Sequence, residues 1–384
     1  MTFVVLPRGA GGRAARLLMT ACLLGLVAAC GSSGSKKPEP APLAPVNALL
    51  GVRQVWSLQT GASAVPLMPA VLGNQVWVGS ADGTVVALDA AAGRELWRAQ
   101  AGAPLAAGVG SDGNTVAVVT TANELVAMEA GRVTWRVRLG VGAFTPPLVA
   151  GRRVFVLAAD RSLTAFDASN GARLWQQSRP GDALSLRQAG LLMAMGDTLV
   201  AGQQGRLAGF DPNSGALRWD SVIASPRGTN EIERLVELVA GVSRQGNQLC
   251  VRAFQSAVGC VDTTRGTTAW SRAAAGSVGV AGDDKLLFGT ESTGRVQAWQ
   301  RSGGEPAWNS DRFLHRGLTA PVVVGRSVVF GDSAGFVHLL ARQDGAVLNR
   351  LATDGSGLAA APVLAGDTLV AVTRKGGVFA WRPE

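Results

Sequence analysis

The chain has 384 residues, of which 36 are Lys or Arg and 27 are Asp or Glu, with 47% hydrophobic and 16% charged residues. This composition excludes a long disordered protein, because enough apolar surface is present to form a large core. The 50 Gly and 10 Trp without any Tyr indicate many tight turns rather than long helices. The 4 Cys are too few for a disulfide scaffold. An all-β fold is therefore favoured.

Residues 1–29 have the features of an export signal, with a basic start that carries no acid and an apolar run too short to span a bilayer. The run ends in Val-Ala-Ala-Cys at 27–30, which resembles the bacterial lipobox. The resemblance implies that a signal peptidase cuts before Cys30 and that this residue carries the lipid. An ordinary signal peptide that contains a Cys is the alternative. Gly31 is not the Asp that retains many lipoproteins in the inner membrane, so the resemblance implies transport to the outer membrane.

Residues 30–45 are predicted to form a tether that starts at the lipidated Cys and is rich in Ser and Pro. In an extended polyproline conformation this segment would reach about 45 Å and hold the body of the protein off the membrane. The formal net charge of +9 suits anionic headgroups or acidic protein partners. A basic bias spread evenly over the surface is an equally good interpretation. Nucleic acid is not an expected partner of an exported, lipid-anchored chain.

The remainder of the chain repeats one phrase, in which an apolar residue and Asp are followed after three residues by Gly and after three more by Trp. Complete and degenerate copies, together with one isolated Trp, recur at intervals of 38 to 51 residues. The equivalent positions are Trp56, Trp97, Trp135, Trp175, Trp219, Trp270, Trp308 and Asn349. These positions define eight units.

Each unit has the alternating pattern of short strands separated by turn residues, which predicts four antiparallel strands per unit. A four-stranded sheet for each period of about 44 residues is typical of a propeller blade. We therefore expect residues 46–384 to form an all-β, eight-bladed β-propeller. The strand at 377–381 lacks a following partner and the strand at 54–57 lacks a preceding one, so their pairing is predicted to close the ring.

The Asp-to-Trp phrase has a structural interpretation. Asp starts the turn through side-chain-to-backbone hydrogen bonds, Gly takes the positive-φ position, and the indole lies between adjacent blades with its N–H on a carbonyl. This interpretation assigns blade docking, rather than stacking on a ligand, to Trp97, Trp135, Trp175, Trp219, Trp270 and Trp308.

The phrase, for example at 165–175, resembles the tryptophan-docking motif of the pyrroloquinoline-quinone-type propellers. One branch of that superfamily contains quinoprotein dehydrogenases, and another contains the BamB family of outer-membrane lipoproteins. Blades of about 44 residues leave no room for the insertions that build the quinone cavity in the dehydrogenases. The adjacent Cys pair of that branch is absent, no Ca²⁺-ligand spacing is present, and His315 and His338 are too few for a metal site. No catalytic residue, metal or cofactor is expected.

The BamB branch, whose members act as scaffolds, is similar to this chain in several segments, including 314–322 and 331–336. The two longest intervals between Trp positions are consecutive, so extra length lies in one sector of the ring. The first insert resembles the Leu-Ser-Leu-Arg segment through which BamB-family proteins contact BamA. The resemblance implies that Leu184 and Leu186 are apolar anchors and that Arg187 donates hydrogen bonds to the partner. An edge strand with two core Leu is the alternative.

The second insert, at 228–239, resembles the stretch that supplies two Asp to the BamA-binding patch of the family. Glu237 falls on the first of these positions and keeps the charge, whereas Val239 replaces the second acid. The resemblance therefore implies a polar patch made by Glu237 with Glu233 and Arg234 nearby. A short helix whose apolar face packs on the propeller is the alternative.

Cys250 and Cys260 lie on the two strands of one predicted hairpin, in a compartment that permits disulfides. A two-residue turn at 255–256 would pair Cys250 with Val261 and place the two sulfurs on opposite sides of the sheet. A disulfide then requires a bulge or a loop of odd length. We favour the disulfide, since two free thiols are not expected to persist in an oxidising compartment.

Together, these features predict a lipid-anchored propeller on the periplasmic face of the outer membrane that acts by binding. The resemblance implies the periplasmic domains of BamA and other assembly subunits as partners. Strand edges or the basic surface would meet unfolded outer-membrane proteins. A small quinone-binding propeller, either enzyme or sensor, is the alternative, and an envelope propeller with another partner is a third hypothesis.

Overall fold

The chain divides into two units, Met1–Glu39 and Pro40–Glu384, and the strands of the described residues lie in the second. Most of the expected export signal, with Cys30, and also Leu184, lie outside the described residues. No helix in the described part has the length and apolar character needed to cross a membrane. The computed structural model describes residues 1–5, 38–63, 65–178, 185–230 and 233–384.

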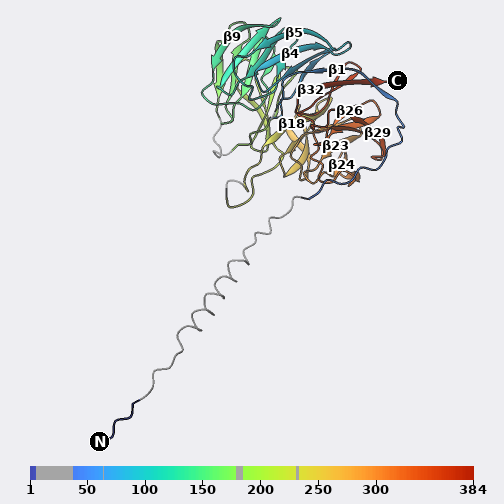
Figure 1. The fold of residues 1–384 in the computed structure, drawn as a ribbon. Helices are drawn as coiled ribbons and strands as arrows, with labels where there is room; N and C mark the ends of the chain where they lie inside the picture. Colours follow the sequence, from blue (N-terminus) through green and yellow to red (C-terminus); the bar gives the residue numbers. More distant parts are fainter. Residues whose placement is uncertain (6–37, 64, 179–184, 231–232) are drawn as a thin grey trace. The chain divides into compact units, whose positions relative to one another are not determined.

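The described part of the second unit forms eight antiparallel sheets of four strands, which are the blades of a propeller (Figure 1). Blade 1 contains β2 (Ala70–Leu72), β3 (Gln75–Gly79), β4 (Thr84–Asp89) and β5 (Arg94–Gln100). Blade 2 contains β6 (Gly110–Ser111), β7 (Thr115–Val119), β8 (Glu124–Glu129) and β9 (Arg132–Arg138). Blade 3 contains β10 (Leu148–Ala150), β11 (Arg153–Leu157), β12 (Leu163–Asp167) and β13 (Arg173–Gln177). Blade 4 contains β14 (Leu192–Met195), β15 (Thr198–Gln203), β16 (Arg206–Phe210) and β17 (Leu217–Val222).

The second half of the ring repeats this arrangement. Blade 5 contains β18 (Leu238–Gln245), β19 (Gln248–Ala253), β20 (Ala257–Asp262) and β21 (Thr267–Ala273). Blade 6 contains β22 (Val280–Gly282), β23 (Leu286–Thr290), β24 (Val296–Gln300) and β25 (Pro306–Ser310). Blade 7 contains β26 (Val322–Val324), β27 (Ser327–Gly331), β28 (Phe336–Ala341) and β29 (Val347–Ala352). Blade 8 contains β30 (Val363–Ala365), β31 (Thr368–Val372), β32 (Gly377–Pro383) and β1 (Val52–Gln59).

Blade 8 closes the ring because its strands come from both ends of the propeller. Strand β1 pairs antiparallel with β32, and Trp56 lies opposite Ala380. The first strands of neighbouring blades lie side by side, as in β2 with β6 and β10 with β14, and β2 also contacts β30. The predicted eight-bladed architecture with a closing strand pair is confirmed.

The core lies between the blades rather than within them. Each hydrophobic cluster of the described residues contains side chains from two adjacent blades, as Val85 and Val118 do for blades 1 and 2. The same holds around the ring, through the pair formed by blades 8 and 1. A blade can therefore bury its faces only by stacking on two neighbours.

The indoles of the repeated phrase join each blade to the next. The Nε1 of Trp135 donates a hydrogen bond of 2.7 Å to the carbonyl of Ala168, which directly follows the Asp of the next phrase. Gly171 of that phrase has a φ of +74°, and a Cβ on it would lie 2.6 Å from the Trp135 ring, so the position requires Gly twice over. Matching indole bonds join Trp56 to Ala90, Trp175 to Pro212, Trp270 to Arg301 and Trp308 to Arg342. Trp97 and Trp219 pack in the same way on Gly131 and Gly266.

The connections between blades all emerge on one side of the ring. Strands alternate in direction within a blade, so the loop from each outer strand to the next blade lies on the same side as the turn between the second and third strands. We call this side the crossover face. It carries the described residues of the connections 178–191 and 223–237, which are the two inserts, and the connection 311–321 between blades 6 and 7.

Cys250 and Cys260 are joined by a disulfide within blade 5. The loop of the hairpin has three residues, 254–256, rather than two, and Ala253 pairs with Ala257, so the loop of odd length that a disulfide requires is present. Gln255 adopts a φ of +50° in this loop. The odd-length loop shifts the register by one residue and places Cys250 directly opposite Cys260, so both sulfurs lie on the same side of the sheet.

Candidate functional site

The two inserts meet on the crossover face. Gly190, at the end of the first insert, forms an isolated antiparallel bridge with Val239, directly after the second. The N–H of Ala240 donates a 2.9 Å hydrogen bond to the carbonyl of Ala189. Two loops from successive interblade connections therefore form one continuous surface rather than two separate features.

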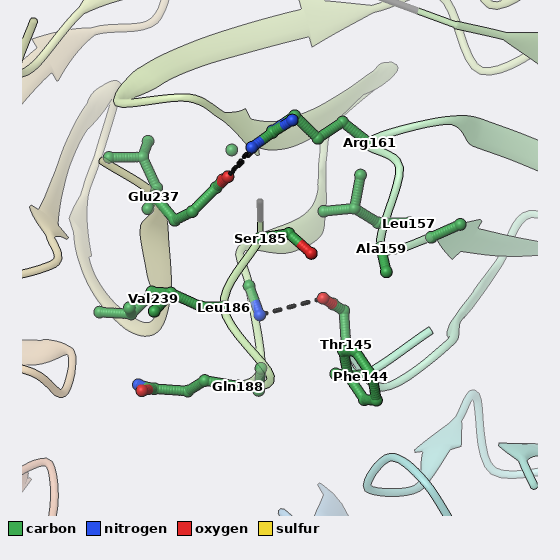
Figure 2. A pocket seen from close by; sticks show the side chains of 15 residues that line it. Phe144, Thr145, Leu157, Ala159, Arg161, Ser185, Leu186, Gln188, Glu237 and Val239 are labelled. Atoms are coloured by element: carbon green, nitrogen blue, oxygen red, sulfur yellow. Dashed lines mark hydrogen bonds and ion pairs between the residues drawn. The ribbon is translucent and has the colours of Figure 1, made fainter. Parts of the chain in front are cut away.

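A small hollow, about 40 Å³ in volume, opens where the inserts meet. Its lining includes Ser185 and Leu186 from the first insert, Glu237 at the end of the second, Val239 on β18, and Thr145 from the connection between blades 2 and 3. Figure 2 shows these side chains around the hollow. The Thr145 hydroxyl accepts a 3.0 Å hydrogen bond from the Gly190 N–H, which is drawn there as a dashed line. Two residues implied by the resemblance, Leu186 and Glu237, are thus brought together.

Glu237 is held by an arginine from another blade. Its Oε1 accepts from the Nε (2.9 Å) and pairs with the Nη2 (2.7 Å) of Arg161, as Figure 2 shows. The side chains are only 8% (Arg161) and 14% (Glu237) exposed, and Glu237 Oε2 also accepts from the N–H of Gln204. Both carboxylate oxygens thus bond to groups of the protein itself, and Glu237 fixes the second insert against blades 3 and 4.

Arg187 and Gln188 extend from the same loop in two directions. The exposed guanidinium of Arg187 lies 5.5 Å from the centre of the Phe144 ring, in the connection between blades 2 and 3. The Nε2 of Gln188 donates a 2.6 Å hydrogen bond to the carbonyl of Ser277, in the connection between blades 5 and 6. The segment 185–190 thus spans three interblade connections and presents Arg187 to solvent.

Glu233 and Arg234 do not line this hollow. The Glu233 carboxylate folds back on its own loop and accepts from the N–H of Thr229 (2.8 Å), while Asn230 Oδ1 accepts from the Glu233 N–H (2.9 Å). These two bonds hold Glu233 against residues 229 and 230 of the same loop, and the bond from Thr229 lowers the pKa of Glu233. The described residues of 228–239 form no helix, so the alternative of a packed helix is wrong for them.

Two contributors to the site were missed from the sequence, Arg161 and Phe144. A signal for Arg161 exists in the turns between second and third strands, where one residue takes a positive φ. Blades 1 and 6 use Gly there, whereas blades 3, 4 and 5 use Arg161 (φ +65°), Gln204 (+50°) and Gln255 (+50°). A non-Gly residue at a positive φ is uncommon and can mark a functional site, but Arg152 adopts the same conformation (φ +61°) in the turn between β10 and β11, so this signal is weak.

The described residues contain no group of three or more His, Cys, Asp or Glu able to hold a metal. His338 is fully buried in blade 7, with its Nε2 3.0 Å from Asp332 Oδ2, and His315 is exposed on the crossover face.

The fold and the site together define a class of protein: a propeller that presents a surface of interblade loops on one face. The sequence model of the family described as "Outer membrane protein assembly factor BamB" matches residues 81–310. A relative of that name from Burkholderia pseudomallei is 36% identical over 361 residues, which cover 93% of this chain and 95% of the relative. The chain belongs to the BamB family.

Solved structures agree with this assignment. BamB from Moraxella catarrhalis matches with a TM-score of 0.79 and 26% identity, over 86% of this chain and 99% of that one. A europium-containing methanol dehydrogenase matches with a TM-score of 0.67 and 13% identity, over 86% of this chain and 93% of that one, and this likeness concerns the fold alone. Of the two alternatives, scaffold and quinone enzyme, the scaffold is confirmed, because the family is that of the non-catalytic assembly factors.

Proposed function

We propose that this chain is a lipid-anchored scaffold subunit of the outer-membrane β-barrel assembly machinery, held at the periplasmic face of the outer membrane through Cys30. Membership in a family of outer-membrane assembly factors supports this role. The lipobox-like sequence before Cys30 supports the anchor. The Cys30→Ser variant is expected to leave the membrane fraction while the unmodified chain stays in it, and equal partition of the two would contradict the anchor.

The proposed partner is the set of periplasmic domains of BamA, and the observation that carries the proposal is the convergence of the two inserts. Leu186 and Glu237 line one hollow although they come from different interblade connections. Half-buried Leu186 supplies an apolar anchor next to exposed Arg187, a combination typical of interface hot spots. Glu237 acts as a positioning residue, because Arg161 engages its carboxylate.

Binding of the soluble form, starting at Gly31, to the periplasmic domains of BamA from the same host tests this interface. We expect the double variant Leu186→Ala/Arg187→Ala to lose at least about tenfold in affinity, or about 1.4 kcal/mol. The matched control is Arg173→Ala/Leu174→Ala, since these exposed neighbours on β13 have the same residue types outside the hollow. Equal affinities of the two double variants would move the interface elsewhere, and no binding by the folded unmodified chain would contradict the partner.

Unfolded outer-membrane proteins are the proposed clients. Outer strands of successive blades expose large apolar side chains, namely Val133 on β9, Leu174 on β13, and Leu217 and Val222 on β17. An extended client segment can pair with such an edge and place alternate side chains on these residues. A photo-reactive residue at Leu217 is expected to crosslink to an unfolded barrel protein, whereas one in the exposed turn at Asn114 is not. Equal yields at the two positions would contradict an edge-specific contact.

A further inference from the structure

Residues 40–50, which we call the strap, run along the outer side of blade 7. The N–H of Ala41 donates a 2.9 Å hydrogen bond to the carbonyl of Leu314, and the N–H of Leu49 donates a 2.8 Å bond to that of Leu348 on β29. Figure 1 shows this segment in blue, outside β29 on its way to β1. The predicted tether of 30–45 is therefore not free over its whole length, since its last residues lie on the propeller.

Side chains of the blade 7 sector attach the strap by donating to its backbone carbonyls. Each of these bonds is 2.8 to 3.0 Å long, and the side chain of Leu43 packs against the core cluster between blades 6 and 7. The attachment is thus distributed over the whole strap. The four donors are Arg316 to Ala41, Arg350 to Ala44, Arg326 to Leu49 and Asn349 to Leu50.

The end of the strap nearest the lipid is attached to a buried group. Arg316, with a side chain only 9% exposed, bonds through its Nε to Asp332 Oδ2 at 2.8 Å, and that carboxylate is fully buried. His338 contacts the same oxygen. Because Arg316 is held on one side by Asp332, its Nη1 offers Ala41 a fixed donor rather than a mobile surface side chain.

The position of this attachment limits how the propeller can lie at a membrane. Ala41 meets Leu314 in the connection 311–321, which is on the crossover face. Only residues 31–40 then separate Cys30 from the body, a reach of at most about 40 Å for a fully extended chain. A chain free up to Val52 would reach roughly 75 Å and would leave either face able to approach the bilayer.

We propose that the strap orients the propeller, so that the crossover face near blades 6 and 7 is turned toward the phospholipid leaflet that holds the anchor. The inserts lie on the same face, so the protein partner is bound on the membrane side of the propeller. A reach of about 40 Å leaves space for a small periplasmic domain between that face and the lipid. This inference rests on the proposed lipid anchor at Cys30.

Quenching of a fluorescent label by lipids with nitroxide headgroups tests the orientation in the full, lipidated chain on phosphatidylethanolamine/phosphatidylglycerol liposomes. Two single-Cys variants label opposite ends of blade 6: Thr293→Cys on the crossover face and Lys285→Cys in the turn between β22 and β23. Both positions are exposed and are separated by the length of β23, about 17 Å. The disulfide between Cys250 and Cys260 keeps the native thiols from reacting with a maleimide label.

We expect quenching at Thr293 to exceed that at Lys285 several-fold. A flexible Gly-Ser insert of about twelve residues between Lys37 and Pro38 alters no residue of the propeller and should reduce the difference. The variant Arg326→Ala/Asn349→Ala/Arg350→Ala, which leaves Arg316 and Asp332 intact, should reduce it as well.

The outcomes separate the two proposals. Equal quenching at the two positions, or stronger quenching at Lys285, in a chain that floats with the liposomes would overturn the orientation and leave the anchor standing. If the lipidated chain and its Cys30→Ser variant both fail to float, the anchor is overturned and the orientation with it. An unchanged difference in both the insert and the triple variant would show that the strap does not set the orientation.

Discussion

Two sectors of the crossover face use the same device, an arginine–carboxylate pair removed from solvent. In the insert sector Arg161 holds Glu237, with side chains 8% and 14% exposed. In the strap sector Arg316 holds Asp332, with side chains 9% and 0% exposed. Each pair joins an interblade connection to the turn between a second and a third strand. Each therefore holds in place a connection that the hydrogen bonds between strands do not reach.

The two pairs differ in what surrounds them. Arg161 and Glu237 lie on different blades, border a hollow and leave Leu186 and Arg187 on the surface. Asp332 also contacts His338 and the N–H of Phe336, and Arg316 is covered by Ala41 of the strap. The first arrangement therefore supports an accessible surface, whereas the second forms a closed cluster whose loss affects the core of blade 7.

The largest expected effect is in the closed cluster. The Asp332→Asn substitution leaves buried Arg316 without its anion, and we expect a loss of about 3–5 kcal/mol in the free energy of unfolding. Chemical denaturation measures it. The control Asp311→Asn breaks the pair with Arg295, in which both side chains are 48% exposed, and should cost less than about 1 kcal/mol. Similar losses in the two variants would show that burial does not distinguish the pairs.

The insert sector should respond less. The Glu237→Gln substitution keeps the shape of the side chain but removes the charge opposite Arg161, and we expect a loss of about 2 kcal/mol in unfolding free energy. Affinity for the proposed partner should fall with it, since the wall of the hollow is no longer fixed. The control is Glu124→Gln, whose pair with Arg136 is 3.8 Å long and more than one third exposed. An effect of Glu237→Gln no larger than that of the control would contradict the positioning role.

The same contrast explains how far prediction from the sequence could reach. The Asp-to-Gly-to-Trp phrase encodes contacts between units about 40 residues apart, so the ring, its closing pair and the docked indoles follow from spacing. The bond between Arg161 and Glu237 joins residues 76 positions apart and depends on how two loops meet above the ring. No local pattern marks Arg161 as the partner, except its unusual place in a turn.

The register of the hairpin with Cys250 and Cys260 shows a second limit. Turn preferences favour Gly or Asn at a positive φ, so a loop centred on Gln255 is not expected from residue type. In the structure, the N–H of Gln255 donates a 2.8 Å bond to the carbonyl of Gly276, outside the hairpin. A register shift of one residue changes which side of the sheet each Cys faces. The sequence predicts a tether over 30–45 but not its attachment from Ala41 onward, because the attaching side chains come from near the other end of the chain.

A smaller effect is expected from acid titration of the strap sector. Burial lowers the pKa of His338, although the bond to Asp332 opposes the shift, and the positive charges of Arg350 and Arg316 lower it further. The folded protein thus keeps His338 neutral while the unfolded chain takes up a proton below about pH 6.5. Stability should therefore fall as the pH drops below that value, by at most about 1.4 kcal/mol per pH unit.

The measurement is denaturation at pH 7 and at pH 5. His338→Gln should flatten the dependence, while His315→Gln, at the other histidine of the chain, should not. The lowered pKa of Asp332 contributes stability that is lost only below about pH 4, outside this interval. A steep dependence that persists in His338→Gln would assign the effect to another group.

The smallest effect on stability is expected where the site is most exposed. Arg187 contacts the Phe144 ring at 5.5 Å, and an exposed contact of this kind contributes about 0.5–1 kcal/mol, so Arg187→Ala should scarcely change the melting temperature. Its affinity for the BamA periplasmic domains should nevertheless fall by about tenfold, because interface arginines often contribute more to binding than to folding. The control Arg173→Ala should change neither quantity. Two results would contradict this: Arg187→Ala destabilises the fold as much as Glu237→Gln, or it binds the partner as tightly as the unmodified chain. In either case the insert sector has a structural role like that of the strap sector, and the binding surface lies elsewhere on the ring.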